Sequence, residues 1–70
     1  VCTEAANTIN ALVTNRSITR TNIIVGEQFF IDQGVPVISG CKLEFLGVNY
    51  NLEQIISYSG QGNILTLRFP

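Results

Sequence analysis

A chain of 70 residues forms one domain at most, and a domain of this size buries only ~60 % of the surface that its unfolded chain exposes. Charged residues make up 13 % of the chain against roughly 25 % in typical domains, and the net charge of −1 excludes a nucleic-acid binder that relies on a basic surface. Hydrophobic residues reach 46 %, yet no apolar run approaches the ~18 residues of a membrane-spanning helix, so the composition favours a subunit whose surface is covered by partner chains.

The first predicted element is a helix over residues 3–14. Its apolar residues recur at steps of three and four and form one stripe: Cys2, Ala5, Ala6, Ile9, Leu12 and Val13. Thr3 is expected to cap the N-terminus, with Glu4 in the first turn, where a negative charge is favourable. A helix of about three turns needs packing to persist. We therefore expect it to cover one opening of a sheet or barrel, or else to dock on a partner.

A strand is predicted over residues 17–25, which are rich in β-branched side chains. The next segment, residues 26–40, is predicted to be a projecting loop, with a short strand as the alternative for residues 26–34. It contains three consecutive large apolar residues, Phe29, Phe30 and Ile31. Either they fold into the core of their own domain or they insert into a neighbouring chain, as exposed apolar surface usually does. Pro36 cannot donate to a strand ladder, so the segment around it is expected at a sheet edge or in an extended connection.

Three more strands are predicted over residues 42–46, 48–57 and 64–69, in the order of a meander, because apolar and polar residues alternate along them. Gly47 marks the first turn, and the glycine-rich "SGQGN" marks the second. The adjacent Ile55 and Ile56 change the phase of the alternation, which indicates a bulge or a strand end. The sequence thus predicts one mainly β domain over residues 1–70 with a short N-terminal helix.

The residue types argue against an enzyme and against a bound metal or cofactor. The chain has no histidine, so it lacks Ser–His and Cys–His pairs, and its five acids are scattered, although Glu27 and Asp32 share one segment. Its two cysteines, Cys2 and Cys41, are too few and too far apart for the usual four-ligand zinc site. They are expected either as two buried thiols or as one disulfide in an oxidising compartment. Association with other chains is the supplement that the composition favours for so small a core.

Among the few cations, Arg20 on the first predicted strand and Arg68 on the last are candidates for pairing with acids across a subunit boundary. Ordinary exposed charges are the alternative interpretation. The two arginines, together with Phe29, Phe30 and Ile31, form the candidate partner interface.

The stretch "GCKLEFLGVNYNLEQIISYSGQGNILTLRF" follows one order of features: a glycine, an apolar strand, a glycine turn, an aromatic residue, two spaced apolar residues, a glycine-rich loop and a final apolar strand. The positions that carry this order are Gly40, Leu43, Phe45, Gly47, Tyr50, Leu52, Ile55, Gly60, Gly62, Leu65 and Leu67. The order resembles the C-terminal meander of the small head–tail connector proteins of tailed bacteriophages, the head-closure or stopper family that closes the neck below the portal. Cys41 stands where that family more often has Asp, so the resemblance leaves stopper, adaptor, tail-terminator and baseplate roles open.

The resemblance implies a small β-barrel or sandwich that forms a homo-oligomeric ring in the virion, assembled in the host cytoplasm. Its partners would be further copies of the chain, the portal or adaptor, and tail proteins, with passive contact to DNA in the channel and none to a membrane. Residues 26–40 would contact a neighbouring subunit or ring, or narrow the channel. The turn and scaffold positions would be Gly40, Gly47, Tyr50, Gly60 and Gly62.

Two other functions are compatible with the residues. The first is a small secreted or surface β-domain that binds a partner and is stabilised by a Cys2–Cys41 disulfide. The second is an accessory domain of an enzyme, whose catalytic residues would have to come from elsewhere.

Overall fold

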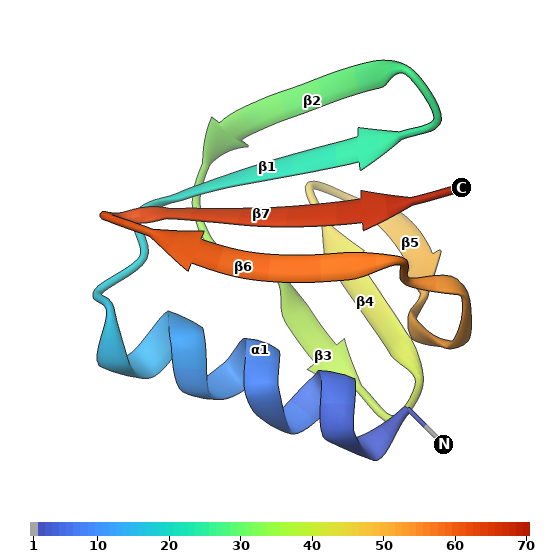
Figure 1. Ribbon diagram of the computed structural model, residues 1–70, viewed down its shortest axis with the longest axis horizontal. Helices are drawn as coiled ribbons and strands as arrows, with labels where there is room; N and C mark the ends of the chain where they lie inside the picture. The colour runs from blue at the N-terminus through green and yellow to red at the C-terminus, as the bar shows by residue number, and fades with distance from the viewer. Residues whose placement is uncertain (1) are drawn as a thin grey trace.

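A computed structural model of the protein describes residues 2–70 (Figure 1). This part of the chain forms, in order, α1 (Thr3–Asn15), β1 (Arg20–Val25), β2 (Gln28–Gln33), β3 (Val37–Ser39), β4 (Lys42–Phe45), β5 (Val48–Asn51), the short 3-10 helix η1 (Leu52–Gln54), β6 (Ser57–Gln61) and β7 (Ile64–Phe69). The fold is mainly β, with one N-terminal helix and a C-terminal meander of strands, which confirms the predicted fold class.

The described strands make two sheets, and neither closes into a barrel. The larger sheet has the strand order β2-β1-β7-β6, and the smaller one has the order β3-β4-β5. All neighbouring strands run antiparallel except β1 and β7, which pair in parallel with Ile23 opposite Leu67. The first and last strands of the chain are thus neighbours at the centre of the larger sheet. The barrel alternative is therefore wrong, because both sheets keep free edges.

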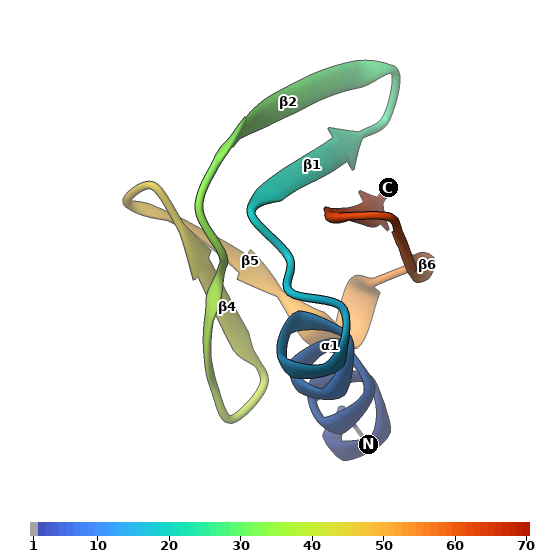
Figure 2. The same ribbon diagram turned by 90° about the vertical axis from the view of Figure 1, so that its left-hand side faces the viewer.

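The hydrophobic core lies between the two sheets and the helix (Figure 2). Thr21, Ile23 and Val25 alternate along β1 toward this core, and the parallel register places Leu65, Leu67 and Phe69 of β7 beside them on the same face. The smaller sheet contributes Leu43 and Phe45, which are buried, and Tyr50, whose ring stacks on Phe69 with 5.2 Å between the ring centroids. Both sheets therefore present one apolar face to a shared interior.

The helix closes the open side between the two sheets (Figure 2). Cys2, Ala5 and Ile9 are buried, and the remaining members of the predicted stripe pack partly against the core. The stripe and its packing role are thus confirmed. The expected cap is wrong by one residue: Cys2 occupies the N-cap position without a side-chain cap bond, and Thr3 is the first helical residue. The backbone oxygen of Cys2 accepts the first helical hydrogen bond, from the N–H of Ala6.

A disulfide joins Cys2, at the start of α1, to Cys41, in the turn between β3 and β4. The two Cα atoms lie 5.5 Å apart, within the range that a disulfide spans. Of the two states expected for these cysteines, the structure therefore has the bonded one. The link ties the helix directly to the smaller sheet across 39 positions of sequence.

Residues 26–40 do not form a projecting loop, and this prediction is wrong. They contain β2, which pairs with β1 along its whole length, and β3, which pairs with β4. A two-residue turn at Gly26 and Glu27 reverses the chain, and the Thr21 hydroxyl donates to the Gly34 carbonyl at 2.8 Å at the other end of the hairpin. The apolar run of β2 does not alternate, which left a short strand only as an alternative. As expected from Pro36, β3 is an edge strand.

The predicted strand over residues 48–57 is divided between the two sheets. β5 ends at Asn51, whose side-chain oxygen accepts a hydrogen bond from the Glu53 N–H at 2.9 Å and starts the 3-10 helix η1. Leu52 is buried there, and the chain crosses from the smaller to the larger sheet before β6 begins. The phase change at Ile55 and Ile56 marks this crossing.

The sequence placed Gly60 in the turn between β6 and β7. In the structure it lies within β6 instead. A β-carbon at this position would lie 2.9 Å from Cδ of Arg16 and 3.2 Å from Cδ2 of Leu12. Gly60 therefore allows the C-terminal end of α1 to approach the sheet closely. The turn itself consists of Gly62 and Asn63.

Candidate functional site

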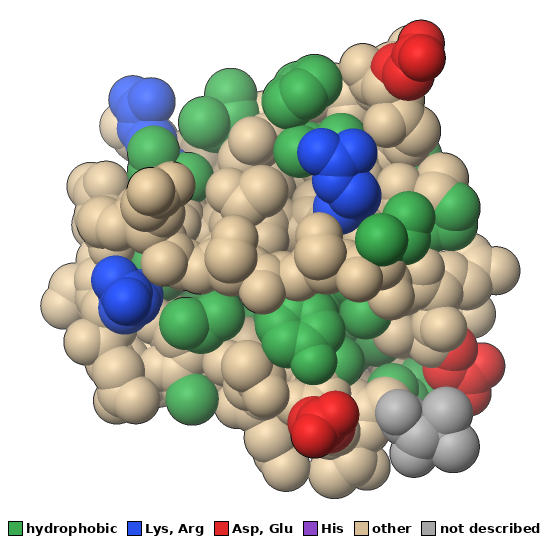
Figure 3. Space-filling model, in the orientation of Figure 1, with side chains coloured by type: hydrophobic (Ala, Val, Ile, Leu, Met, Phe, Trp, Pro, Cys, Tyr) green, Lys and Arg blue, Asp and Glu red, His purple; other side chains and the backbone are tan. Residues whose placement is uncertain are grey.

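Most of the exposed large apolar residues among residues 2–70 lie on β2 and around the turn between β4 and β5. All six residues of β2 are exposed, including Phe29, whose exposed fraction is 65 %. Leu46 and Val48 at the β4–β5 turn are also exposed. We call these five apolar residues, Phe29, Phe30, Ile31, Leu46 and Val48, the β2 patch. In Figure 3 hydrophobic side chains lie along the β2 edge of the molecule and others lie between β6 and α1, while the backbone and other side chains, drawn in tan, cover most of the rest of that face.

The β2 patch lines a groove of about 620 Å³. One wall comes from β2 and the end of β1, and the other comes from Phe45, Leu46, Val48 and Tyr50 of the smaller sheet. Asp32 is the charged residue among those that line it. A mostly apolar groove with one acid suits apolar side chains of a partner better than a polar metabolite.

The two faces of β2 carry different parts of the patch. The register with β1 puts Phe30 in the same row as Ile23, on the side of the core. Phe29 and Ile31 project from the opposite, outer face, where Phe29 adjoins the buried Ile24 of β1. The sequence left open whether Phe29, Phe30 and Ile31 fold into the core or stay available to a neighbouring chain. In the structure all three are exposed, on one face of β2 or the other.

Leu46 is held in an unfavourable backbone conformation while its side chain faces solvent. Its φ is 54°, and that of the next residue, Gly47, is 82°. Two central residues with positive φ make the type I′ turn that suits a two-residue β-hairpin, for which Asn-Gly is the preferred pair. Leucine at the first position costs roughly 1–2 kcal/mol by comparison, because its β-carbon crowds the following carbonyl. A strained and exposed leucine beside an apolar groove indicates a residue kept for contact rather than for folding.

We expect Leu46→Asn to raise the free energy of unfolding by about 1 kcal/mol, because asparagine adopts a positive φ at lower cost. The midpoint of urea unfolding, followed by circular dichroism, measures the change. Leu46→Ala is the matched control: it removes the apolar side chain but lacks the polar group through which asparagine hydrogen-bonds locally at a positive φ, so the backbone strain remains. An equal gain in both variants would contradict strain as the cause.

The other candidate residues are not brought together into one site. Arg20 and Arg68 both lie on the outer face of the larger sheet, but the register places Arg20 beside Gln33 and Ile64, and Arg68 beside Ile24 and Ser57. Glu27 lies in the β1–β2 turn and Asp32 near the far end of β2. Five residues of extended strand separate these two acids by about 16 Å, so they do not form a carboxylate pair.

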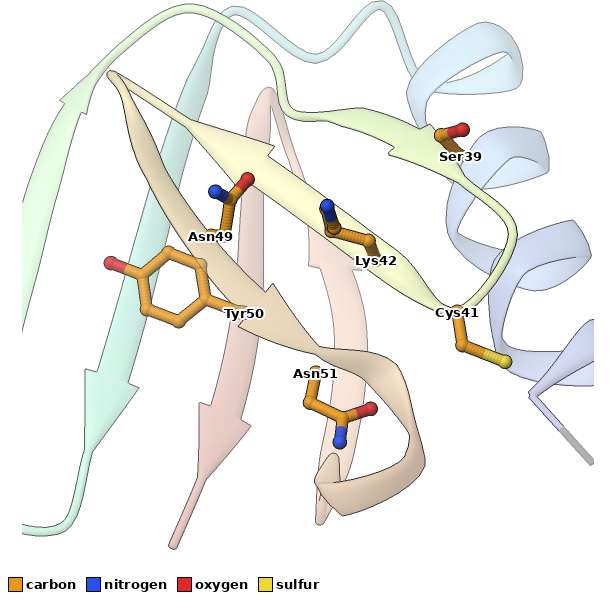
Figure 4. Close-up of a pocket in the computed structure, with 6 residues that line it drawn as sticks. All are labelled: Ser39, Cys41, Lys42, Asn49, Tyr50 and Asn51. Atoms are coloured by element: carbon orange, nitrogen blue, oxygen red, sulfur yellow. The ribbon is translucent and has the colours of Figure 1, made fainter.

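A second hollow, of about 490 Å³, lies on the smaller sheet (Figure 4). Its lining comes from β3, the β3–β4 turn, β4 and β5, and consists of Ser39, Cys41, Lys42, Asn49, Tyr50 and Asn51. Lys42 supplies a single cation, and the asparagines supply amide groups. The Cys41 sulfur at its border is bonded to Cys2, so it is not available as a nucleophile.

One group of possible metal ligands occurs within residues 2–70: Cys2, Cys41 and Glu53, whose ligand atoms lie within 4.8 Å of one another. Thiolates, not disulfide sulfurs, bind metal ions. The Cys2–Cys41 bond therefore leaves the Glu53 carboxylate as the one ligand that the oxidised protein offers there.

Comparison with known proteins adds no relative. No family model matches the chain, and no curated protein or solved structure matches it either. Within the described residues, no helix has both the length and the apolar character needed to cross a membrane. The function is therefore inferred from the surface of this chain itself.

The sequence pointed to Phe29, Phe30 and Ile31 but missed Leu46 and Val48 as part of the same surface. The alternation predicts these two residues only as parts of a hairpin. A leucine before a glycine in a two-residue turn, where Asn or Asp is usual, was the signal available.

Proposed function

We infer that this chain is a non-enzymatic structural subunit that assembles with copies of itself. The observation that carries this proposal is the β2 patch: an edge strand with three consecutive large apolar residues, beside a groove whose other wall is also apolar. Exposed apolar surface of this kind usually marks an interaction site. The low share of charged residues agrees with a surface that neighbours cover.

The assembly that we propose is a ring at the head–tail junction of a phage or phage-like particle. Its support is the order of glycine, apolar and aromatic positions from Gly40 onward, which resembles the head-closure proteins of tailed phages. In such a ring the chain would connect the portal or adaptor to the tail and help to retain DNA. The two rigid sheets would hold the β2 patch toward the neighbouring subunit or the next ring.

A second candidate function is favoured by the disulfide. Disulfides persist in oxidising compartments and are rare in the cytosol. The Cys2–Cys41 bond therefore supports a small secreted or surface β-domain that binds a partner through the same patch. The two candidates share the surface and differ in the compartment and in the occupant.

Native mass spectrometry of the purified chain tests the proposal. We expect an assembly with a fixed number of copies at micromolar concentration, and we expect Phe29→Ser combined with Phe30→Ser to break it into smaller species whose chains remain folded by circular dichroism. The two positions are exposed, so these changes leave the core intact. Val37→Ser combined with Ile56→Ser is the matched control, because these residues are similarly exposed but lie outside the patch and should leave assembly unchanged.

A wild-type chain that stays monomeric, also with candidate neck proteins present, would contradict the ring. A monomer that binds an unrelated partner only while its disulfide is intact would support the second candidate instead. Unfolding of the Phe29 and Phe30 double variant would show that these side chains stabilise the fold rather than the assembly.

A further inference from the structure

The two sheets formed by residues 2–70 have four edge strands, and three of them are protected against pairing with another chain. β3 is three residues long and follows Pro36, and β5 exposes the amides of Asn49 and Asn51. β6 carries serine and glutamine side chains and packs against α1. Short length, proline, polar side chains and a covering helix are the usual means by which proteins block edge pairing.

β2 has fewer of these protections, because its polar residues Gln28, Asp32 and Gln33 lie toward its two ends and leave its centre apolar. It is six residues long, contains no lysine or proline, and has large apolar residues at its centre. Such an edge is a template for another strand. Two features of β2 indicate which strand would pair with it: the pattern of its free backbone groups and its sequence.

The backbone groups that point outward from β2 follow from one hydrogen bond. The Gly34 N–H donates to the Thr19 carbonyl at 2.8 Å. Because backbone groups alternate in direction along an antiparallel strand, those of Gln28, Phe30 and Asp32 point toward β1. Those of Phe29, Ile31 and Gln33 therefore point toward the free edge, where no strand of the described chain pairs with them. The Gln33 N–H donates to the neighbouring Asp32 carboxylate at 2.7 Å, so the free groups of Phe29 and Ile31 carry the edge pairing.

The sequence around β2 reads nearly the same in both directions. The segment "GEQFFIDQG" is centred on Phe30, with Phe29 and Ile31 on either side, then Gln28 and Asp32, then Glu27 and Gln33, and a glycine at each end. A strand of this kind is self-complementary when two copies run antiparallel, because each residue faces one of its own chemical class or a hydrogen-bonding partner.

We propose that β2 pairs antiparallel with β2 of a second copy of this chain, about a two-fold axis at Phe30, and joins two four-stranded sheets into one sheet of eight strands. In this register Phe29 faces Ile31 of the partner subunit, and the outward backbone groups of both residues meet to form two hydrogen-bonded pairs. Phe30 faces its own copy in the pair between them, where side chains approach most closely.

The neighbouring two-fold registers are less favourable. Moving the axis to Ile31 places Phe30 opposite Asp32, a phenyl ring against a carboxylate. Moving it to Phe29 places Ile31 opposite Glu27. An axis between two residues fails for a different reason, since outward backbone groups of one copy would then face inward groups of the other. Only the Phe30 axis matches both the backbone groups and the side chains.

The charges agree with the same register. Asp32 of each copy faces the Gln28 amide, which donates hydrogen bonds, and Glu27 faces Gln33, so no two acids lie directly opposite each other. On the outer face, Phe29 and Ile31 of both copies form one apolar band that continues into the buried Ile24.

This pairing does not rest on the proposed ring, because it needs only a second copy of the chain. A two-fold contact uses the same surface on both subunits and closes on itself, so it makes a dimer. A ring built from such dimers needs a second, different contact surface on each chain. The two proposals can therefore fail independently.

Cysteine cross-linking tests the register. Under mild oxidation of the intact, disulfide-bonded protein, Phe30→Cys should give covalent dimers by itself. Gln28→Cys and Asp32→Cys should each stay monomeric on denaturing gels but should cross-link when the two variants are mixed, because residue 28 faces residue 32 of the other copy. Ile56→Cys, which is exposed but distant in sequence from β2, is the control for random collision.

Phe30→Cys that cross-links no more than Ile56→Cys would overturn the pairing, and cross-linking of Gln28→Cys alone would overturn the register. In a second measurement without cysteines, Phe29→Lys should raise the dimer dissociation constant by at least about tenfold in sedimentation equilibrium, because lysine blocks edges. An unchanged constant would contradict the pairing. Dimers without larger assemblies would support the pairing and contradict the ring. A ring in which Phe30→Cys gives no covalent dimers would support the ring and contradict the pairing.

Discussion

Changing both Cys2 and Cys41 to alanine is expected to lower the free energy of unfolding by about 4 kcal/mol. The disulfide closes a loop across 39 positions, and the entropy that it removes from the unfolded chain corresponds to roughly that amount at 25 °C. A single core in a chain of this length rarely supplies more than about 3–5 kcal/mol. The loss is thus similar to the whole stability of the domain, and we expect a largely unfolded variant.

Urea and thermal unfolding of the oxidised wild type, the reduced wild type and the double variant, followed by far-UV circular dichroism, measure this effect. The reduced wild type should resemble the double variant. Ser39→Ala, an exposed substitution near the same turn, should change the free energy of unfolding by less than about 0.5 kcal/mol. A double variant within about 1 kcal/mol of the wild type would show that the disulfide is not what supplements the small core.

The second large effect is expected for Leu67→Ala, which should lower the free energy of unfolding by about 3 kcal/mol. Leu67 is fully buried in β7, the strand that pairs with both β1 and β6. It lies between Ile23 and Tyr58 on the core face of the larger sheet, so truncation leaves a cavity at the centre of the domain. The rigid neighbours on both sides limit how far the structure can relax into that cavity.

The shift of the urea midpoint measures this loss, with Ile56→Ala as the matched control. Ile56 is 60 % exposed, so its truncation should cost less than about 0.5 kcal/mol. Equal losses for the two variants would contradict a core packed between the sheets. Leucine and isoleucine have the same number of apolar carbon atoms, and both changes leave alanine. The difference between the two losses of unfolding free energy therefore reports burial and not side-chain chemistry.

The β2 patch also bears on these measurements. If two copies pair through β2, the apparent stability rises with protein concentration, because binding to the folded state alone shifts the unfolding equilibrium. At Leu46, stability of the domain and availability for contact make opposite demands on one residue. Its backbone is strained and its side chain is exposed, so the domain would be more stable without it.

Local elements were readable from the sequence because their signals are local. The helix follows from apolar residues at steps of three and four, and the strands of the meander follow from alternation and from glycines at the turns. For β2 the sequence left a short strand and a loop as alternatives, because Phe29, Phe30 and Ile31 are all apolar and give no alternation. Its strand character depends on pairing with β1, and its exposure on both faces removes the usual difference between the core side and the solvent side.

The sequence by itself determined a mainly β domain with an amphipathic N-terminal helix, a low charge and an apolar segment with more hydrophobic residues than its position requires. Only the tertiary structure decided that β1 lies parallel to β7, that Cys2 reaches Cys41, and that Leu46 joins the apolar residues of β2. The physical reason is the same in each case. Propensity and periodicity act over a few neighbouring residues, whereas strand partners, disulfides and grooves are set by contacts between segments that lie far apart in the chain.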